Sequence, residues 1–419
     1  MSTRSNWSGN VQFASTRCDA PASLPEVQAV VGGSAKVRAI GSAHSFNRLA
    51  DTNGVHISVA NLPRNVEIDS YARVASVPAG MRWGVLAQDL HTRGWGLSNL
   101  ASLGHISAAG AVATATHGSG DTNPTLSADI SGVEMITAGG DHVTLTRADN
   151  PEIFPGSVVA LGALGVTTRL LVDIQPAFEI RQYVYDNISH ESLLADFDGV
   201  FGSAYSVSFF TCWAADGLGQ VWMKRREDKD PTWDQPEWMG GTLAPVKRHP
   251  LPGHDALHCT EQGGALGPAY DRLPHFALDF TPSSGDELQT EYLVPRDRAV
   301  ELLAAVDRLA PRIRPLLYVS EIRTMAGDDC WLSGAYGRDT VGIHFTWQRK
   351  PEVADLLTEL DDIFAPAGGR PHWGKMYQAG QTSISARYPR FNDFVNLVAT
   401  MDPQGKFRNS TLDDLLGEN

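Results

Sequence analysis

The chain has 419 residues, 42% of them hydrophobic and 20% charged, which is ordinary for a soluble globular protein long enough for two or three domains. Its 48 acidic residues outnumber its 34 basic ones, and the net charge of -14 argues against binding to nucleic acid or to an anionic membrane surface. No apolar run is long enough to span a membrane, and the polar N-terminal stretch contains no secretory signal. Four widely spaced cysteines are typical of reduced thiols, so we expect a cytoplasmic protein, and nothing in the pattern demands more than a monomer.

The first part of the chain alternates short helices and strands. Between the second predicted helix and a predicted hairpin, residues 101–120 are so rich in Ala, Ser, Thr and Gly that neither a packed strand nor a strong helix is expected there. Apolar periodicity and turn residues predict helices at 23–31 and 83–94, strands at 36–40, 55–59 and within 66–77, a hairpin at 130–147, and an apolar strand that ends at Pro176.

After Pro176 the strands become longer and richer in aromatic residues, which places a domain boundary near residue 177. The basic run 224–226 is expected to be a solvated strand edge. We expect a first domain of residues 1–176, completed by a C-terminal return of residues 370–419, and a second domain of residues 177–369. The pattern predicts strands at 205–213, 220–226, 275–280 and 287–294, and helices at 296–309 and 351–364.

Two stretches of small residues could receive a ligand. Residues 41–45 follow a predicted strand directly, and their exposed N–H groups could bind a pyrophosphate, although an ordinary turn with a hydrogen-bonded histidine is the commoner explanation. Residues 102–120 contain almost no large side chain, so a planar ligand could lie against the backbone there. The alternative for this second stretch is a tightly packed coil between domains.

Two predicted strands carry polar residues at alternate positions. Glu321 and Arg323 share one face of the first strand, and His344 and Thr346 share one face of the second, because side chains in a strand repeat every two residues. If these faces meet, they place a carboxylate, a guanidinium, an imidazole and a hydroxyl in one cleft, a set that suits the binding of several substrate hydroxyls. The alternative is a sheet with one wet face and a solvated ion pair.

Two other motifs are weaker. Residues 369–376 nearly match a phosphate-binding loop, but Met376 stands where a magnesium-binding hydroxyl is needed. His254, His258 and Cys259 resemble metal ligands, yet no carboxylate completes the set in register. We therefore predict neither an ATP site nor a metal site.

Taken in order, a series of motifs resembles the alditol oxidases of actinomycetes, within the vanillyl-alcohol-oxidase flavoprotein superfamily. The resemblance covers essentially the whole chain; H-F-T-W with R-P-H-W-G-K is specific to that subgroup, whereas the two Gly/Ser motifs are shared more widely. The motifs are V-R-A-I-G-S-A-H-S-F, N-L-A-S-L-G-H-I-S-A-A-G, T-H-G-S-G, A-L-G-A-L-G-V, S-E-I-R-T, G-R-D-T-V-G-I-H-F-T-W, R-P-H-W-G-K and M-D-P-Q-G-K-F.

The resemblance implies an α+β fold with an FAD-binding domain and a substrate domain built on an antiparallel sheet. It also implies that FAD is attached covalently through His44, by attack of the neutral imidazole on the flavin 8α-methyl group. The positions that match flavin contacts are Gly41, Ser42, Ala43, His44, Ser45, Ser102, Ser107, Gly110, Thr114, His117, Gly118, Ser119, Gly165, Val166 and His372.

The same resemblance implies oxidation of a terminal carbinol of a sugar alcohol, such as xylitol or sorbitol, with hydride transfer to the flavin and reduction of O2 to hydrogen peroxide. His344 or Lys375 would assist removal of the hydroxyl proton, and Arg323 and Lys375 would stabilise negative charge on the reduced flavin. The implied substrate-binding positions are Ser102, Gln289, Glu321, Arg323 and Thr346, and the implied catalytic positions are Arg323, His344 and Lys375.

Two alternatives stay open: a sugar-lactone oxidase or dehydrogenase of the same superfamily, and a flavin- or carbohydrate-binding protein without catalysis. Two residues depart from the expected pattern. Ala43 stands where Gly is expected, and its methyl group would strain the loop if the residue needs a positive φ. Gly104 stands where Pro is expected, which predicts a more mobile loop.

Overall fold

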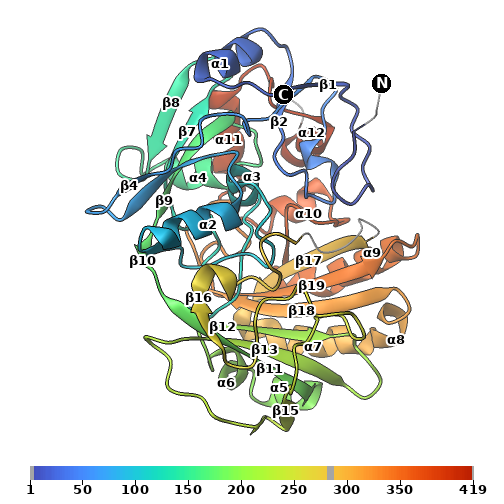
Figure 1. Ribbon diagram of the computed structural model, residues 1–419. Coiled ribbons are helices and arrows are strands. Elements are labelled where there is room, and N and C mark those ends of the chain that lie inside the picture. The colour runs from blue at the N-terminus through green and yellow to red at the C-terminus, as the bar shows by residue number, and fades with distance from the viewer. Residues whose placement is uncertain (1–3, 281–286, 418–419) are drawn as a thin grey trace.

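The computed structural model describes residues 4–280 and 287–417, which form an upper and a lower block in Figure 1. The upper block contains a five-stranded and a three-stranded sheet, and the lower block contains a ten-stranded sheet. This combination of helices with mainly antiparallel sheets confirms the predicted α+β class. Within the described ranges, no helix is long and apolar enough to cross a membrane.

The upper block is built from the N-terminal part of the chain. Its parallel sheet has the order β1 (Arg17–Asp19), β3 (Val55–Ile57), β2 (Val37–Ala39). Its antiparallel sheet has the order β4 (Glu67–Asp69), β5 (Val74–Pro78), β9 (Val166–Asp173), β7 (Ile130–Ile136), β8 (His142–Thr146), and a separate pair joins β6 (Trp95–Gly96) to β10 (Gln175–Pro176). The helices here are α1 (Leu24–Gly32), α2 (Trp83–Thr92), α3 (Ala108–Ala113) and α4 (Phe154–Val158).

The lower block is one antiparallel sheet with helices on one face (Figure 1). The helices are α5 (His190–Ala195), α6 (Phe197–Phe201), α7 (Ala299–Arg308), α8 (Ala310–Ile313) and α9 (Val353–Phe364). The strand order is β14 (Glu237–Trp238), β15 (Gly241–Leu243), β11 (Glu179–Ser189), β13 (Leu218–Arg226), β12 (Ser206–Thr211), β18 (Leu317–Met325), β19 (Thr340–Gln348), β17 (Glu287–Pro295), β20 (Arg370–Pro371), with β16 (Leu266–Pro268) paired to β11.

Side-chain alternation decides which face of this sheet is apolar. Ile322 of β18 and Ile343 of β19 are fully buried in one core with Leu302 of α7 and Leu360 of α9. The neighbouring polar residues of the same strands therefore point to the opposite face, toward the upper block. The long sheet thus presents a polar surface to the N-terminal part of the chain.

The C-terminal segment returns to the upper block. Its helices are α10 (Gln381–Ser385), α11 (Phe391–Met401) and α12 (Ser410–Leu416). Phe394 and Leu397 of α11 lie in the same hydrophobic core as Leu86 and Leu90 of α2. This packing is compatible with the predicted C-terminal return, while the domain limits at residues 176 and 369 stay a prediction.

Most predicted helices and strands are present with shifted ends. The small-residue tract contains the six-residue helix α3, although no strong helix was expected there. The predicted strand at 275–280 is wrong: Phe276 makes one isolated bridge to Cys259, and the segment is otherwise irregular. The reason is that its backbone groups bind separate loop segments: the His275 N–H donates to the Ser102 carbonyl, and the Ala277 N–H donates to the His258 carbonyl.

The prediction of a solvated edge at 224–226 is also wrong. Strand β13 lies between β11 and β12, and Lys224, Arg225 and Arg226 are all buried. Each cation has partners: Arg225 donates to the Ser203 carbonyl, and Arg226 pairs with the exposed Asp228 and lies over the Phe178 ring. A basic run therefore lies in an inner strand because every charge has polar or aromatic neighbours there.

Candidate functional site

A cavity of about 370 Å³ lies between the upper block and the polar face of the long sheet. Its wall combines segments that are distant in the sequence: residues 38–45, 101–117, 161–167 and 372–375, together with Glu291 and Arg323 of the sheet. Most of the positions predicted to contact a flavin line it. They are Gly41, Ser42, Ala43, His44, Ser45, Ser102, Ser107, Gly110, Thr114, His117, Gly165 and His372.

The loop that follows β2 is closely fitted to the start of α3. A Cβ at Gly41 would collide with the Ser107 hydroxyl, and the Ser107 N–H donates to Ser42 Oγ at 3.4 Å. Ala43 has a φ of 52°, so the positive φ at which its methyl group was expected to cause strain is present. The Trp7 N–H donates to the Ala43 carbonyl at 2.8 Å, which helps to hold this conformation.

His44 is half-buried and lines the cavity. Its Nδ1 lies 3.3 Å from His105 Nε2, and its ring lies 4.4 Å from the Trp7 ring. Nε2 has no hydrogen-bond partner among the described residues. Burial, with the nearby charge of Lys375, lowers the pKa of His44 well below 6.5, so the imidazole is neutral at pH 7. A neutral imidazole has the protonation state required of a nucleophile.

Three predicted flavin positions do not line the cavity. Gly118 lies against Asn99, where a Cβ would not fit. The Ser119 hydroxyl donates to the Val207 carbonyl and so ties the upper block to β12. Val166 opens β9 and is buried in an apolar cluster.

The structure gives a reason for the glycine at position 104, where the family pattern has Pro. A Cβ at Gly104 would lie 3.2 Å from Gly84 Cα and 2.9 Å from Leu278, and the Gly84 N–H donates to the Gly104 carbonyl. The loop therefore approaches α2 closely, and the missing side chain is what allows this approach. The predicted mobility of the loop stays a prediction.

The two polar strand faces meet, which is one of the two arrangements that the sequence left open. Strands β18 and β19 are neighbours, with Glu321 opposite His344 in the register. Arg323 Nε lies 3.5 Å from Glu321 Oε1, and Arg323 Nη1 donates at 3.3 Å to Oγ of Ser102, which also lines the cavity. Glu321, Arg323 and His344 are only 6%, 7% and 8% exposed, which excludes the alternative of a wet face with a solvated ion pair.

Glu291 on β17 joins this group, and sequence analysis missed it. It is 1% exposed; its Oε1 accepts from Arg323 Nη2 at 3.0 Å, and its Oε2 lies 3.4 Å from His344 Nδ1. Although burial raises its pKa, the charges of His117 and Arg323 outweigh this effect and leave the pKa well below 4.5. The available signal was its alternation with Glu287 and Gln289, which places three polar side chains on one face of the strand.

Lys375 reaches the same region from the C-terminal segment. Its ammonium donates to Gln289 Oε1, and it lies 5.1 Å from the Phe46 ring. Burial lowers the pKa of Lys375 to about 8, although Glu291 opposes this shift. Thr346 receives a contact from His344 Nε2 at 3.1 Å. Four of the predicted substrate-binding and catalytic residues (Gln289, Glu321, Thr346 and His344) lie in the network beside the cavity and do not line it.

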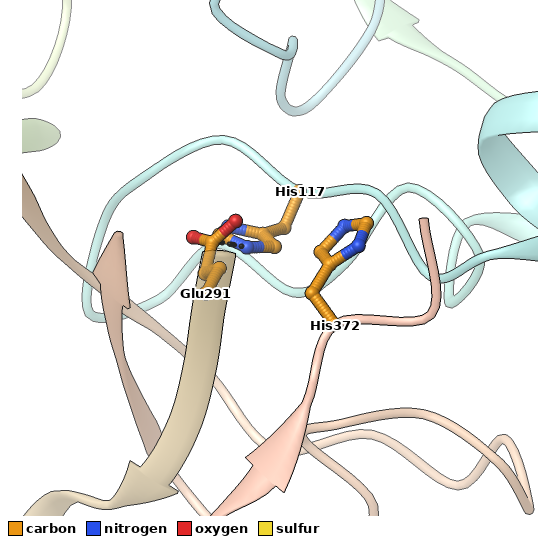
Figure 2. A group of neighbouring side chains, drawn as sticks. All are labelled: His117, Glu291 and His372. Atoms are coloured by element: carbon orange, nitrogen blue, oxygen red, sulfur yellow. Dashed lines mark ion pairs between the residues drawn. The ribbon is translucent and has the colours of Figure 1, made fainter. Parts of the chain in front are cut away.

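Figure 2 shows a further cluster of His117, Glu291 and His372, whose potential metal-ligand atoms all lie within 4.8 Å of one another. His117 Nε2 lies 3.1 Å from Glu291 Oε1, the same oxygen that binds the Arg323 guanidinium. His372 Nδ1 accepts from the Gly374 N–H at 3.0 Å. A dication here would compete with Arg323 for the carboxylate, so the cluster is better described as the centre of an ion-pair network.

The three residues that resemble metal ligands in the sequence, His254, His258 and Cys259, have separate neighbours. The His254 ring stacks on His249, the His258 ring stacks on Phe280, and Cys259 is buried in an apolar cluster. Each ring or thiol is thus placed by packing.

Comparisons with known proteins agree with this geometry. Residues 18–146 match the FAD binding domain family, and residues 286–415 match the D-arabinono-1,4-lactone oxidase family. The chain is 45% identical to an alditol oxidase from Streptomyces sp., over 99% of this chain and 100% of the relative. It is 29% identical to an L-gulono-1,4-lactone dehydrogenase from Mycobacterium tuberculosis, over 99% of each chain. The crystal structure of cholesterol oxidase from B. sterolicum has the same fold, with a TM-score of 0.79 at 14% identity over 99% of this chain and 96% of that one.

Proposed function

We propose that this chain, which belongs to the alditol oxidase family of FAD-dependent oxidoreductases, oxidises the terminal carbinol of a sugar alcohol such as xylitol or sorbitol to the aldose. The observation that carries the proposal is the buried group of Glu321, Arg323 and His344, in which Arg323 lines the cavity and donates to Ser102. These side chains supply several hydrogen-bonding groups and a fixed positive charge, as recognition and oxidation of a polyol require.

The cavity fits the cofactor that the family implies. Loop 41–45 and the tract 102–117 present backbone with few side chains, and a Cβ at Gly110 would lie only 2.7 Å from Ser107 Oγ. The unpartnered Nε2 of His44 and the neutral state of its ring support covalent attachment at this residue. A bound FAD would supply an acceptor for the hydride of the carbinol carbon and a route for the two electrons to O2, with hydrogen peroxide as the product once two protons are added.

The residues of the site have three proposed roles: binding of hydroxyl groups, removal of the hydroxyl proton, and stabilisation of negative charge. Glu321, Ser102 and Thr346 bind hydroxyl groups, because a carboxylate accepts and a hydroxyl both donates and accepts. His344 takes the hydroxyl proton, since burial keeps its pKa below 6.5 and its ring is neutral at pH 7.

Arg323 and Lys375 hold positive charge beside the cavity, where it stabilises negative charge that develops during oxidation. Arg323 keeps its proton because Glu321 and Glu291 raise its pKa despite burial. Gln289 orients the Lys375 ammonium through its side-chain oxygen. The positive charges are thus held by buried partners in a fixed place.

A second candidate is oxidation of a sugar lactone. It is favoured by the match of residues 286–415 to the D-arabinono-1,4-lactone oxidase family and by the Mycobacterium relative. Oxygen consumption with xylitol, sorbitol and an aldonolactone, compared with reduction of an artificial dye, separates the two functions. Peroxide formation from the alditols supports our proposal, and turnover of the lactone alone would contradict it.

Two measurements test the cofactor. Acid precipitation of the purified protein should leave the yellow flavin in the pellet, and flavin in the supernatant would contradict attachment at His44. Anaerobic addition of xylitol or sorbitol should then bleach the flavin absorbance. The Glu321→Gln variant is the matched control for bleaching by the polyol, because it keeps the shape of the side chain and removes its charge.

A further inference from the structure

Lys224 is a buried cation that none of the proposed roles uses. It lies on β13, separated by β12 from the strand that carries Glu321, and is 1% exposed. Its Nζ donates to the Leu273 carbonyl and lies 3.4 Å from the Pro274 carbonyl and 3.1 Å from His275 Nδ1. An ammonium buried at such cost is kept only where its hydrogen bonds matter to the fold or to a neighbouring site.

The contacts of Lys224 determine which nitrogen of His275 carries the proton. A lysine ammonium can only donate, so His275 Nδ1 accepts while Lys224 is charged. Burial lowers the pKa of Lys224 to about 7, although the charge of Glu321 opposes this shift, so the ammonium is the main form below that pH. The ring proton is then on Nε2, which lies 2.7 Å from Glu321 Oε1. That N–H can donate to Glu321 only if the carboxylate accepts, which the ionised form does. The chain of contacts from Lys224 through His275 to Glu321 therefore has one consistent set of donors and acceptors.

His275 is held firmly enough to transmit this constraint. Its ring lies edge-on to Phe210 and Trp222, with centroids 5.2 and 5.3 Å away. Its backbone N–H donates to the Ser102 carbonyl at 3.1 Å. His275 thus touches two of the proposed substrate residues, one through its side chain and the other through its backbone.

The carboxylate of Glu321 is oriented by these contacts. In the described part of the chain, the closest contacts of Glu321 with His275 and with Arg323 are both made by Oε1. Oε2 makes neither of these two contacts. Burial and the charge of Lys224 lower the pKa of His275 to about 4. The ring is therefore neutral at pH 7 and adds no positive charge beside Glu321.

We propose that Lys224 and His275 are positioning residues: Lys224 fixes the Nε2–H tautomer of His275, and His275 holds the Glu321 carboxylate in the orientation that binds a polyol hydroxyl. The inference rests on the proposed function, because it concerns the same site. Removal of Lys224 would release the tautomer and allow a ring nitrogen without a proton to face the carboxylate.

The first test is a set of variants of the flavin-loaded protein. Anaerobic stopped-flow reduction by xylitol gives an apparent Kd for the polyol and a limiting reduction rate. Lys224→Met should raise the Kd about tenfold and change the limiting rate much less, because it disturbs substrate binding and not the reacting groups. His275→Gln keeps an N–H donor toward Glu321 and should bind xylitol nearly as the unmodified chain does. In that background Lys224→Met should have little further effect, since no tautomer remains to be fixed.

The outcomes separate the explanations. An equal rise of the Kd on Lys224→Met in both backgrounds would show that Lys224 acts through packing, and an unchanged Kd in the single variant would overturn the proposal as well. Flavin content and thermal unfolding of each variant show that the fold is kept.

A second test needs no substrate. Nitrogen NMR of the protein with labelled histidine, compared with His275→Gln, should show His275 as the neutral Nε2–H tautomer. A protonated Nδ1 would overturn the proposal even if Lys224→Met fails to fold. If His275 has the Nε2–H tautomer but no polyol bleaches the flavin, the proposed function is wrong, while the assignment of the tautomer is confirmed.

Discussion

The polar face of the long sheet and the loops of the cavity wall were predicted with different success. On β18 and β19, a repeat of two residues was enough to place Glu321 with Arg323 and His344 with Thr346, and the strand register then joined the two pairs. In the tract 102–120 no such repeat exists, and Gly118 and Ser119 lie away from the cavity. Strand periodicity determines the face of the sheet to which each side chain points. A loop of small residues indicates only that another group can approach its backbone closely.

The largest expected effect tests the sheet side of this comparison. Arg323→Leu should slow flavin reduction by sugar alcohols by roughly 10²–10³-fold, because it removes a fixed charge beside the reacting centre. It should also destabilise the protein by about 3–5 kcal/mol, since Glu291 and Glu321 would remain buried without their cation. Anaerobic stopped-flow reduction and urea unfolding measure the two effects. Full turnover in this variant would contradict the charge-stabilising role of Arg323.

The second expected effect concerns Lys375, which joins the two regions. With a pKa of about 8, its positive charge is present below that pH and is lost as the pH rises through it. If the charge assists oxidation, the reduction rate should fall about tenfold between about pH 7 and pH 9, and Lys375→Met should abolish this dependence. A rate that rises through the same range would instead make Lys375 the base.

How much of the site was predictable follows from these particular residues. The shared faces of β18 and β19 came from alternation, and the flavin loop came from the resemblance of its motif. Glu291 and His275 were missed because their partners are set by tertiary contacts: Glu291 pairs with Arg323 and His117, and His275 lies in a segment mispredicted as a strand. The burial of Lys224 was not predicted for the same reason. The composition of a basic run does not show which groups will surround its charges in the interior.

A third, smaller effect tests the loop side. His44→Ala should move the flavin from the acid pellet to the supernatant while FAD still binds, because the other lining residues of the cavity remain. The purified protein should therefore stay yellow and lose flavin on denaturation. Flavin that stays in the pellet would show that the attachment is at another residue, and His105→Ala is a suitable comparison because His105 contacts the same ring.

The smallest expected effect concerns the backbone of the same loop. Ala43 has a φ of 52°, in a region that costs an alanine roughly 1–2 kcal/mol and a glycine almost nothing. Ala43→Gly should therefore stabilise the protein by about 0.5–1 kcal/mol, after the greater freedom of glycine in the unfolded chain is subtracted. Ala29→Gly is the matched control: Ala29 is exposed within helix α1, where the same change should destabilise by about 0.5–1 kcal/mol. Urea unfolding of both variants measures the difference. If both substitutions destabilise equally, the loop stores no strain at Ala43, and the flavin loop is a relaxed structure whose alanine is simply tolerated.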